Sequence, residues 1–453
     1  MAPDNCNGSS DTANQCEPQH RQSSYASSLV QSSEPGQLRG NTSLRQSETY
    51  RELASMIHES HNGPSKLLLL IVPIAIVSRF AGLPAVAVFL LNMIALVPLA
   101  ALSIFTVLVL TRNAGFWGGF IRTVFGNAIE LTLGITGLYH SEISLVQQMV
   151  IGSALIYSLF VLGGSFLRAS YGKQNEPFSK TKTAVLSSLV LVSSFCLAIP
   201  AAMATAADKE FRDGQNVGTV NDPSEDVLLL SRMTATVLLC LFLTYLNFRF
   251  LSHAQLFPKN PNAAQFNPET RIESTLDGIK YASTRSLVLS FSFISSIACA
   301  AICASSLVTS IDAAVQKLNI TKSFIGFVIT PLAASLAKSV AIVKHARSER
   351  NHEDQRMSQL DFVIRSVMTN ILDTLLVIIP LLILLGWLMG KPIALDFGLF
   401  ETVVFLMAII VMTYLLQYGK TTYFEGCMLM GTYVSIAVAF YVRPESLEET
   451  STR

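Results

Sequence analysis

A carboxyl group and a side-chain amide lie within one helical turn of each other in the middle of an apolar stretch. Asn127 and Glu130 occur in the sequence Phe125-Gly126-Asn127-Ala128-Ile129-Glu130-Leu131, and residues three apart share one face of a helix. An ionisable group at the centre of a membrane helix costs at least ~2.5 kcal/mol, and such groups seldom lack a function. We therefore expect Glu130 to hold a cation or a proton. The structural alternative is a carboxyl group neutralised by protonation or by a lysine.

The same spacing recurs twice in the C-terminal part of the chain. Ser335 and Lys338 form one pair, and Asn370 and Asp373 form the other. The candidates for proton coupling, substrate coupling or acid–base chemistry are Glu130, Lys338 and Asp373. The candidates for substrate contact are Asn127, Ser153, Tyr157, Ser335 and Asn370. The small residues among them pack helices together as readily as they bind a ligand.

The composition indicates what kind of protein must position these residues. Of 453 residues, 51% are hydrophobic and 14% are charged, whereas soluble domains carry roughly 25% charged residues. A soluble enzyme is therefore disfavoured, and a net charge of +1 gives no reason to expect a nucleic-acid partner. The seven cysteines lack paired Cys-x-x-Cys spacing, so no zinc site or disulfide framework is expected. No metal or nucleotide motif is visible, and no cofactor is expected.

Eleven apolar runs follow a polar start. A run of about 20 residues crosses a ~30 Å hydrocarbon core as a helix. The chain is therefore predicted to be an all-α integral membrane protein with about eleven transmembrane helices. The runs cover residues 66–80, 84–109, 117–139, 144–168, 183–206, 227–250, 285–308, 321–344, 361–388, 398–417 and 421–442.

The domain organisation follows from these runs. Residues 1–64 are rich in Ser, Gln, Asn and Gly and are predicted to form a disordered polar tail. The other predicted parts are an N-terminal membrane half (66–250), a loop (251–284), a C-terminal membrane half (285–442) and a short tail (443–453). After one N-terminal helix, the remaining helices make two sets of five, and an odd number per set implies opposite orientations. Inverted repeats of this kind are common in secondary transporters, whose sites lie near the midplane, and they would bring Lys338 opposite Glu130.

The charge of the loops predicts an orientation. Loops on the side of the N-terminus carry more Lys and Arg than the opposite loops, and the opposite loop 207–226 is also acidic. The positive-inside rule then predicts a cytosolic N-terminus and a C-terminus on the other side of the membrane.

Several motifs resemble those of the proton-coupled calcium/cation exchangers of vacuoles and other endomembranes. In the N-terminal half they are Leu96-Val97-Pro98-Leu99-Ala100-Ala101-Leu102, Gly126-Asn127-Ala128-x-Glu130-Leu131, Gly152-Ser153 and Val161-Leu162-Gly163. In the C-terminal half they are Phe324-Ile325-Gly326 with Pro331, Ile379-Pro380, Leu384-Leu385-Gly386-Trp387, Gly390-Lys391-Pro392, Phe400-Glu401-Thr402-Val403 and Tyr423-Phe424-Glu425-Gly426. The resemblance covers nearly all of 66–442 in order. It implies a sodium/calcium-exchanger-like fold, a vacuolar or other endomembrane location, and one acidic residue on the third and on the eighth helix.

The second acidic position departs from the family pattern. Where that pattern has Gly-Asn-Ala-Ala-Glu-His, this chain has Ala334-Ser335-Leu336-Ala337-Lys338-Ser339. Other replacements are Tyr157 for Asn, Thr369-Asn370-Ile371 for Gly-Ser-Ser, and Asp373 for Gln. Calcium takes about six to eight oxygen ligands, and a lysine supplies none. Two unit charges ~4 Å apart at an effective dielectric of ~20 interact by ~4 kcal/mol, and a divalent ion would feel about twice that as repulsion. A buried Glu130–Lys338 ion pair is the simplest way to accommodate both charges, and calcium/proton exchange by the family's usual site is not expected.

Three functional hypotheses follow. The first is a proton-coupled cation antiporter with an altered substrate, such as a monovalent or organic cation; a buried lysine can itself titrate near neutral pH. The second is a transporter scaffold that has become a membrane-embedded enzyme, an acid–base cyclase or isomerase acting on a lipophilic metabolite. The third is a non-transporting relative that acts by association. The expected partners are membrane lipid, protons, and a cation or small lipophilic substrate; the sequence does not indicate an oligomeric state.

Overall fold

The computed structural model describes residues 65–111, 115–172, 175–213, 225–249, 276–345 and 356–442. The predicted polar tail 1–64, most of the predicted loop 251–284 and the tail 443–453 lie outside the described residues, so the predictions made for them stay predictions.

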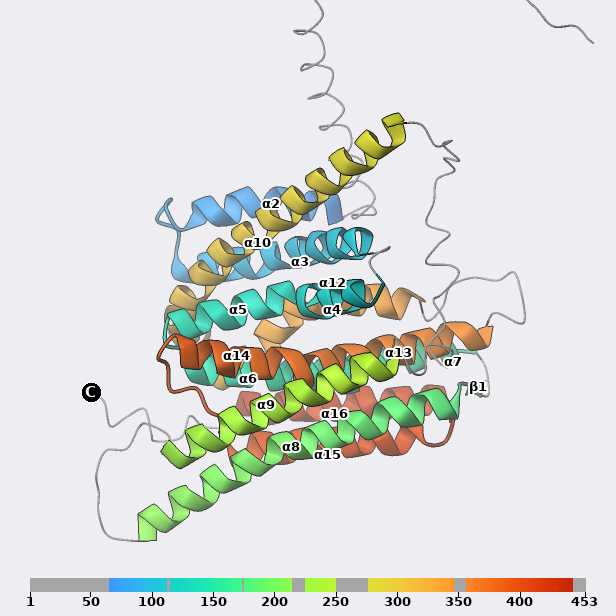
Figure 1. The fold of residues 1–453 in the computed structure, drawn as a ribbon. Coiled ribbons are helices and arrows are strands. Elements are labelled where there is room, and N and C mark those ends of the chain that lie inside the picture. The colour runs from blue at the N-terminus through green and yellow to red at the C-terminus, as the bar shows by residue number, and fades with distance from the viewer. Residues whose placement is uncertain are drawn as a thin grey trace, which may run out of the picture. The chain divides into compact units, whose positions relative to one another are not determined.

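The described residues form helices joined by short connections (Figure 1). In chain order the elements are α2 (Ser65–Ser78), α3 (Ala85–Leu110), α4 (Gly115–Gly126), α5 (Ala128–Tyr139), α6 (Ile143–Leu155), the π-helical η1 (Ile156–Val161), α7 (Leu162–Ser170), β1 (Glu176–Pro177), α8 (Lys180–Asp213), α9 (Glu225–Asn247), α10 (Leu276–Leu318), α11 (Lys322–Phe324), the π-helical η5 (Ile325–Ile329), α12 (Thr330–His345), α13 (Arg356–Asp373), the π-helical η7 (Thr374–Ile378), α14 (Ile379–Leu388), α15 (Leu399–Leu416), β2 (Lys420–Thr421) and α16 (Tyr423–Val442).

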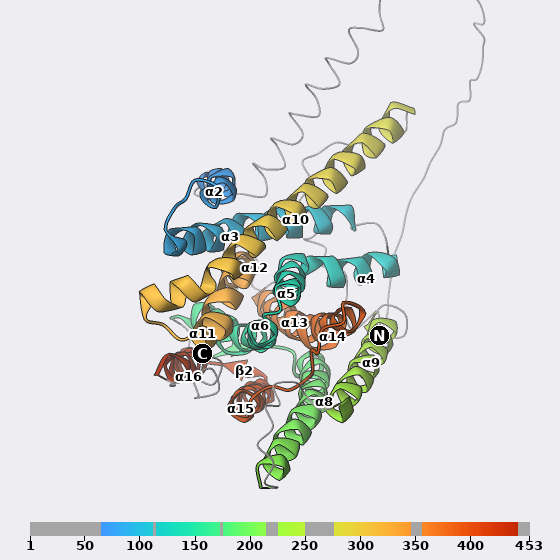
Figure 2. The same ribbon diagram turned by 90° about the vertical axis from the view of Figure 1, so that its left-hand side faces the viewer.

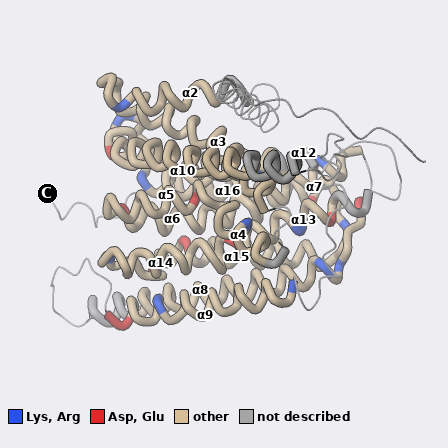
Figure 3. The backbone as a smooth tube through the Cα atoms, turned by 45° about the horizontal axis from the view of Figure 1, so that its top comes forward, with Lys and Arg blue, Asp and Glu red and all other residues tan. Residues whose placement is uncertain are grey.

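The predicted apolar runs are helical in the predicted order. Within the described ranges, nine helices are long and apolar enough to cross a membrane, and two further apolar helices, Leu69–Ser78 and Ala128–Tyr139, are shorter. The count of eleven spans therefore stays a prediction. Charged residues gather toward the two ends of the helices, with few between them (Figure 3), as expected when the middle of each helix faces hydrocarbon.

Two helical stretches form the centre of the bundle. In Ile143–Ser170, 83% of the most apolar window is buried, and in Leu360–Leu388 the share is 72%, against at most 50% in the other spans. Each stretch is interrupted by a π-helical segment, η1 in the first and η7 in the second. Such insertions change which side chains face a neighbour and often occur at functional sites. The two stretches are the fourth and ninth predicted helices, so they occupy matching places in the two sets of five and support the inverted repeat.

The other helices pack around this centre (Figures 1 and 2). α3 packs along α10 and α2, and it also contacts α12. α6 packs against η5, while α7 packs against α16 and α8 against α15. Some of these approaches require glycine: a Cβ atom at Gly152 would overlap the carbonyl oxygen of Phe327. This explains one glycine of the family-like motifs by helix packing, as small-residue contacts do in membranes generally.

A small polar junction also joins the two halves of the chain. β1 pairs antiparallel with β2, with Glu176 opposite Thr421. Next to it, the backbone N–H of Phe178 donates to the carbonyl of Gly419 at 3.0 Å, and that of Ser179 donates to Asp361 Oδ1 at 2.6 Å. These contacts lie near the start of α8 and the end of α15, which is the right-hand side of Figure 1.

Candidate functional site

The centre of the site is a break between α4 and α5. Asn127 has non-helical backbone angles (φ −108°, ψ 25°) and precedes the first residue of α5. In an Asn-x-x-Glu sequence the Asn side chain usually caps the helix by accepting from its free N–H groups. Here Asn127 makes no side-chain cap hydrogen bond. Glu130 lies in the first turn of α5, at the positive end of the helix dipole, where a carboxylate is favoured.

The Asn127 oxygen binds a lysine instead of capping its own helix. The Lys338 ammonium on α12 donates to Asn127 Oδ1 and, at 3.5 Å, to Asn370 Oδ1 on α13. The Asn370 amide nitrogen donates to the Ser366 carbonyl at 2.8 Å, which turns the Asn370 oxygen toward the lysine. The ammonium is thus held by amide oxygens from both halves of the chain, much as a bound cation would be.

The predicted direct pair between Glu130 and Lys338 is wrong in its geometry. Both residues line one small cavity, together with Asn127 and Ser103, and their charges interact. Yet Glu130 is 3% exposed, and neither of its carboxyl oxygens has a hydrogen-bond partner. The helix break is the physical reason, because it presents the Asn127 oxygen to Lys338 and leaves the Glu130 carboxyl group on the cavity wall.

Three further candidates carry buried polar atoms without a hydrogen-bond partner. These atoms are Ser153 Oγ on α6, Tyr157 OH on η1 and Asp373 Oδ1 at the end of α13. The charge of the Lys338 ammonium also interacts with Asp373, and the Tyr157 hydroxyl interacts with both Glu130 and Asp373. Buried polar groups are nearly always hydrogen-bonded, so these atoms are available to a ligand or to water.

Ser335 differs from the other candidates. Its hydroxyl donates to the Pro331 carbonyl of its own helix at 2.7 Å, a common arrangement for serine in helices. Its proton is therefore engaged, and its predicted contact with a substrate stays a prediction.

Sequence reasoning missed a basic group near Asp373. Arg249, just beyond α9, donates to the Tyr245 hydroxyl at 3.1 Å, and its charge interacts with that of Asp373. An arginine at the end of an apolar run usually anchors a helix at the membrane interface, so nothing in the sequence pointed inward. Asp373 is thereby influenced by two cations, Lys338 and Arg249, whereas Glu130 is influenced by Lys338.

The donor set offers little to a divalent metal. Within the described ranges, no three His, Cys, Asp or Glu side chains come together as they would around a metal ion. The charged groups of the site are instead two carboxyl groups and one ammonium. The expectation that the protein holds no resident metal stays a prediction.

Comparison with known proteins identifies the class. The family model described as sodium/calcium exchanger protein matches residues 84–251 and 288–442. A vacuolar calcium ion transporter of Schizosaccharomyces pombe is 30% identical over 382 residues, covering 84% of this chain and 85% of that protein. A putative vacuolar cation/proton exchanger 4 of Oryza sativa subsp. japonica is 29% identical, covering 80% of this chain and 77% of that protein. The solved structure of native YfkE has the same fold, with a TM-score of 0.64 at 19% identity over 83% of this chain and 99% of that chain.

This chain belongs to the sodium/calcium exchanger family, and it is an all-α integral membrane protein with that family's fold. The resemblance inferred from its motifs is confirmed, as is the assignment to the vacuolar cation/proton exchanger group.

Proposed function

We propose that this protein is a proton-coupled antiporter of the cation/proton exchanger type whose substrate is a monovalent cation. Family membership supports cation/proton exchange in general. The observation that carries the altered substrate is the Lys338 ammonium, which is held by Asn127 and Asn370 inside the candidate site.

The charges of the site support a single positive charge as cargo. Asp373 interacts with two cations, Lys338 and Arg249, which would repel a further cation beside it. Glu130 faces the cavity with both oxygens unpartnered and can hold one proton or one monovalent cation. The Tyr157 hydroxyl, which interacts with Glu130, would supply a further oxygen ligand. A divalent ion in this cavity would be repelled by Lys338 and would find too few oxygens.

Location and orientation belong to the same proposal. The vacuolar names of the relatives support a vacuolar or other endomembrane site, and the loop charges support a cytosolic N-terminus.

The enzyme hypothesis has no observation in its favour. The cavity beside Glu130 offers only ≈ 10 Å³ to the centres of water-sized molecules, which is about what a single water molecule needs. A lipophilic metabolite large enough to cyclise would not fit beside the lysine.

A flux assay tests the proposal. The purified protein is reconstituted in vesicles, a pH gradient is imposed, and uptake of Na⁺, K⁺, Ca²⁺ and Mn²⁺ is measured. We expect exchange of Na⁺ or K⁺ for protons, little Ca²⁺ or Mn²⁺ uptake, and loss of exchange in Glu130→Gln. Calcium uptake equal to that of the monovalent ions would overturn the altered substrate, and flux that survives Glu130→Gln unchanged would remove Glu130 from the mechanism.

A further inference from the structure

A dense set of polar contacts joins the two halves on the left-hand side of Figure 1, the face shown in Figure 2. All of them start from residues 140–148 of the N-terminal half, which comprise the connection between α5 and α6 and the first turns of α6. The contacts are His140 Nε2 with Ser305 Oγ (3.0 Å), Ser141 Oγ with Lys391 Nζ (2.7 Å), Glu142 Oε2 with Lys322 Nζ (2.8 Å), Gln147 Nε2 with the Ala394 carbonyl (2.9 Å) and Gln148 Nε2 with Ser323 Oγ (3.3 Å). Every partner belongs to the C-terminal half, and we call this set the α5–α6 clasp.

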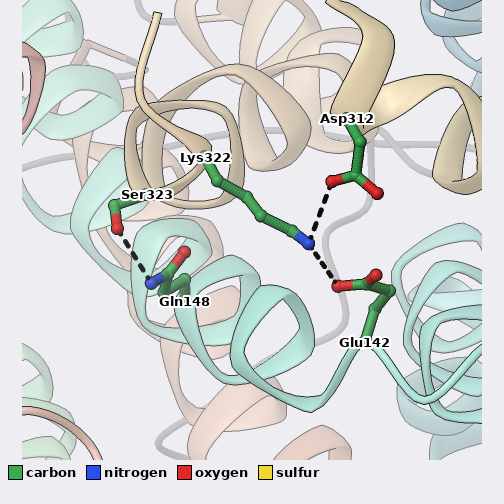
Figure 4. A network of polar contacts seen from close by, with 5 residues as sticks. All are labelled: Glu142, Gln148, Asp312, Lys322 and Ser323. Carbon is green, nitrogen blue, oxygen red and sulfur yellow. Dashed lines mark hydrogen bonds and ion pairs between the residues drawn. The ribbon is translucent and has the colours of Figure 1, made fainter. Parts of the chain in front are cut away.

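Lys322 forms the ion pair of the clasp (Figure 4). Its ammonium lies between Glu142 Oε2 at 2.8 Å and Asp312 Oδ1 at 3.2 Å. The two carboxylates differ in two ways. Glu142 is 28% exposed and belongs to the opposite half, whereas Asp312 is 72% exposed and lies on α10, in the same half as Lys322. The Lys322–Glu142 pair therefore holds the halves together, and the Lys322–Asp312 pair does not.

The turns that precede Glu142 and Lys322 each contain a residue with an unusual backbone conformation. Among the described residues other than glycine, Ser141 (φ 65°) and Asn319 (φ 53°) have positive φ angles. Ser141 precedes Glu142, and Asn319 precedes Lys322 in the turn between α10 and α11. Positive φ is unfavourable for residues with a side chain, and it persists where surrounding contacts impose it, often at switch regions.

An apolar layer lies directly beneath the clasp. A small pocket there is lined by Val146, Gln147, Val150, Ile379 and Leu382, among others. The cavity beside Glu130 is lined instead by Ser103 and Ile104, which lie in the half of α3 farther from the clasp. In the part of the chain that the structure describes, the pocket beneath the clasp is apolar apart from Gln147, and it shares no lining residue with the cavity beside Glu130.

We propose that the α5–α6 clasp is the gate that closes the candidate site toward this face, and that the Lys322–Glu142 pair is the contact that must break for it to open. The purpose of the gate rests on the proposed transport function, since a transporter exposes a central site to each face in turn. The contacts are individually weak and partly exposed, which suits a closure that must open repeatedly.

Cysteine accessibility tests the gate without any transported ion. Val150 is 4% exposed and lies beneath the clasp, so a Val150→Cys reporter reacts with a water-soluble thiol reagent only when this face opens. The reaction is followed in detergent by peptide mass spectrometry, with Val150→Cys in the otherwise native chain as the reference. Adding Glu142→Gln should raise the reporter's labelling rate about fivefold, the population change that loss of about 1 kcal/mol produces.

Asp312→Asn is the matched control, because it removes a carboxylate from Lys322 within one half. Its effect should stay below about twofold, in line with its exposure. Equal effects of Asp312→Asn and Glu142→Gln, or no effect of Glu142→Gln, would overturn the gate. If Glu142→Gln does not fold, Lys391→Gln removes another clasp contact at an exposed position and should also speed labelling; an unchanged rate would count against the proposal.

Failure of the proposed function is separable from failure of the gate. A protein that shows the labelling shift but exchanges no cation for protons would overturn the antiporter proposal and leave the clasp as the closure of this face. A protein that exchanges cations with unchanged labelling in the clasp variants would overturn the gate alone.

Discussion

Under the proposed monovalent function, replacing Lys338 with glutamate should enable the site to bind calcium. At a separation of ~5 Å and an effective dielectric of ~20, unit charges interact by ~3 kcal/mol, so the ammonium opposes a divalent ion by ~7 kcal/mol. Removing that repulsion corresponds to at most ~10⁵-fold in Kd. The gain should be smaller, because Arg249 remains near Asp373. We expect calcium to bind Lys338→Glu at least ~100-fold more tightly than it binds the wild type.

The same substitution should destabilise the calcium-free protein. Lys338 donates to Asn127 and Asn370, and a glutamate would leave both amide oxygens without a donor. It would also add a third carboxyl group to a partly buried site. Loss of one partner from a buried charged network costs about 3–5 kcal/mol. The variant should therefore melt at a lower temperature than the wild type in chelator and regain stability as calcium is added.

Thermal unfolding in a calcium series measures both effects. A ligand at about 100 times its Kd stabilises the folded state by ~2.7 kcal/mol, so a titration from chelator to millimolar calcium shows the binding directly. Lys338→Arg keeps the charge and should show no calcium response. Equal calcium stabilisation of the wild type, Lys338→Arg and Lys338→Glu would refute the claim that the ammonium excludes divalent ions. Calcium/proton exchange should return only in part, because Tyr157 and Asn370 also depart from the family pattern.

Three further substitutions test individual parts of the site. Glu130→Gln should lower proton-coupled cation flux more than ~100-fold, whereas Asp373→Asn should lower it by ~10-fold or less, since Asp373 already interacts with two cations. Flux into vesicles, measured for both variants in parallel, tests this order of effects, and the reverse order would contradict the assigned roles. Tyr157→Phe removes a buried hydroxyl without a partner, so stability should stay within ~1 kcal/mol of the wild type while the Na⁺/K⁺ preference changes; an unchanged preference would remove Tyr157 from the site. Gly152→Ala would bring a Cβ atom into overlap with the Phe327 carbonyl and should destabilise the protein by about 1–3 kcal/mol, whereas Gly431→Ala, with open space around it, should be neutral or stabilising. Equal melting temperatures of the two variants would argue against close packing of α6 and η5.

The fold was predictable because membrane helices are specified locally. A run of about 20 apolar residues satisfies its own backbone hydrogen bonds within a helix, so the runs alone located the helical stretches. Interruptions of those helices were not predictable in the same way. The break at Asn127 and the π-helical segments η1 and η7 depend on what each helix packs against, and the sequence around them remains apolar. The two-residue strands β1 and β2 also escaped prediction, since their pairing joins positions far apart in the chain.

For the candidate site, the sequence indicated which residues lie close together better than it indicated which hydrogen bonds they form. The inverted repeat led to the expectation that Lys338 lies near Glu130, and both residues line one cavity with Asn127, whereas Ser335 bonds within its own helix. The simplest charge pairing then failed, because a helix break made the Asn127 oxygen the better acceptor. Arg249 was missed for a different reason: its position at a helix end is typical of an interface anchor, and only the packing of α9 against η7 brings it near Asp373.

Two lysine ammonium groups connect the halves of this protein at positions where an exchanger could bind a free cation. Lys338 binds acceptors from the two halves at the centre, and Lys322 binds Glu142 of one half and Asp312 of the other at the clasp. A cation that is part of the chain holds the halves together whether or not an ion is bound, so the assembled state does not depend on the ion supply. The positive charge of Lys338 also lowers by one unit the positive charge that a bound cation can carry in the site. Under the proposed function, Lys338 in place of the family's carboxylate would exchange capacity for a divalent ion for an internal, permanent positive charge.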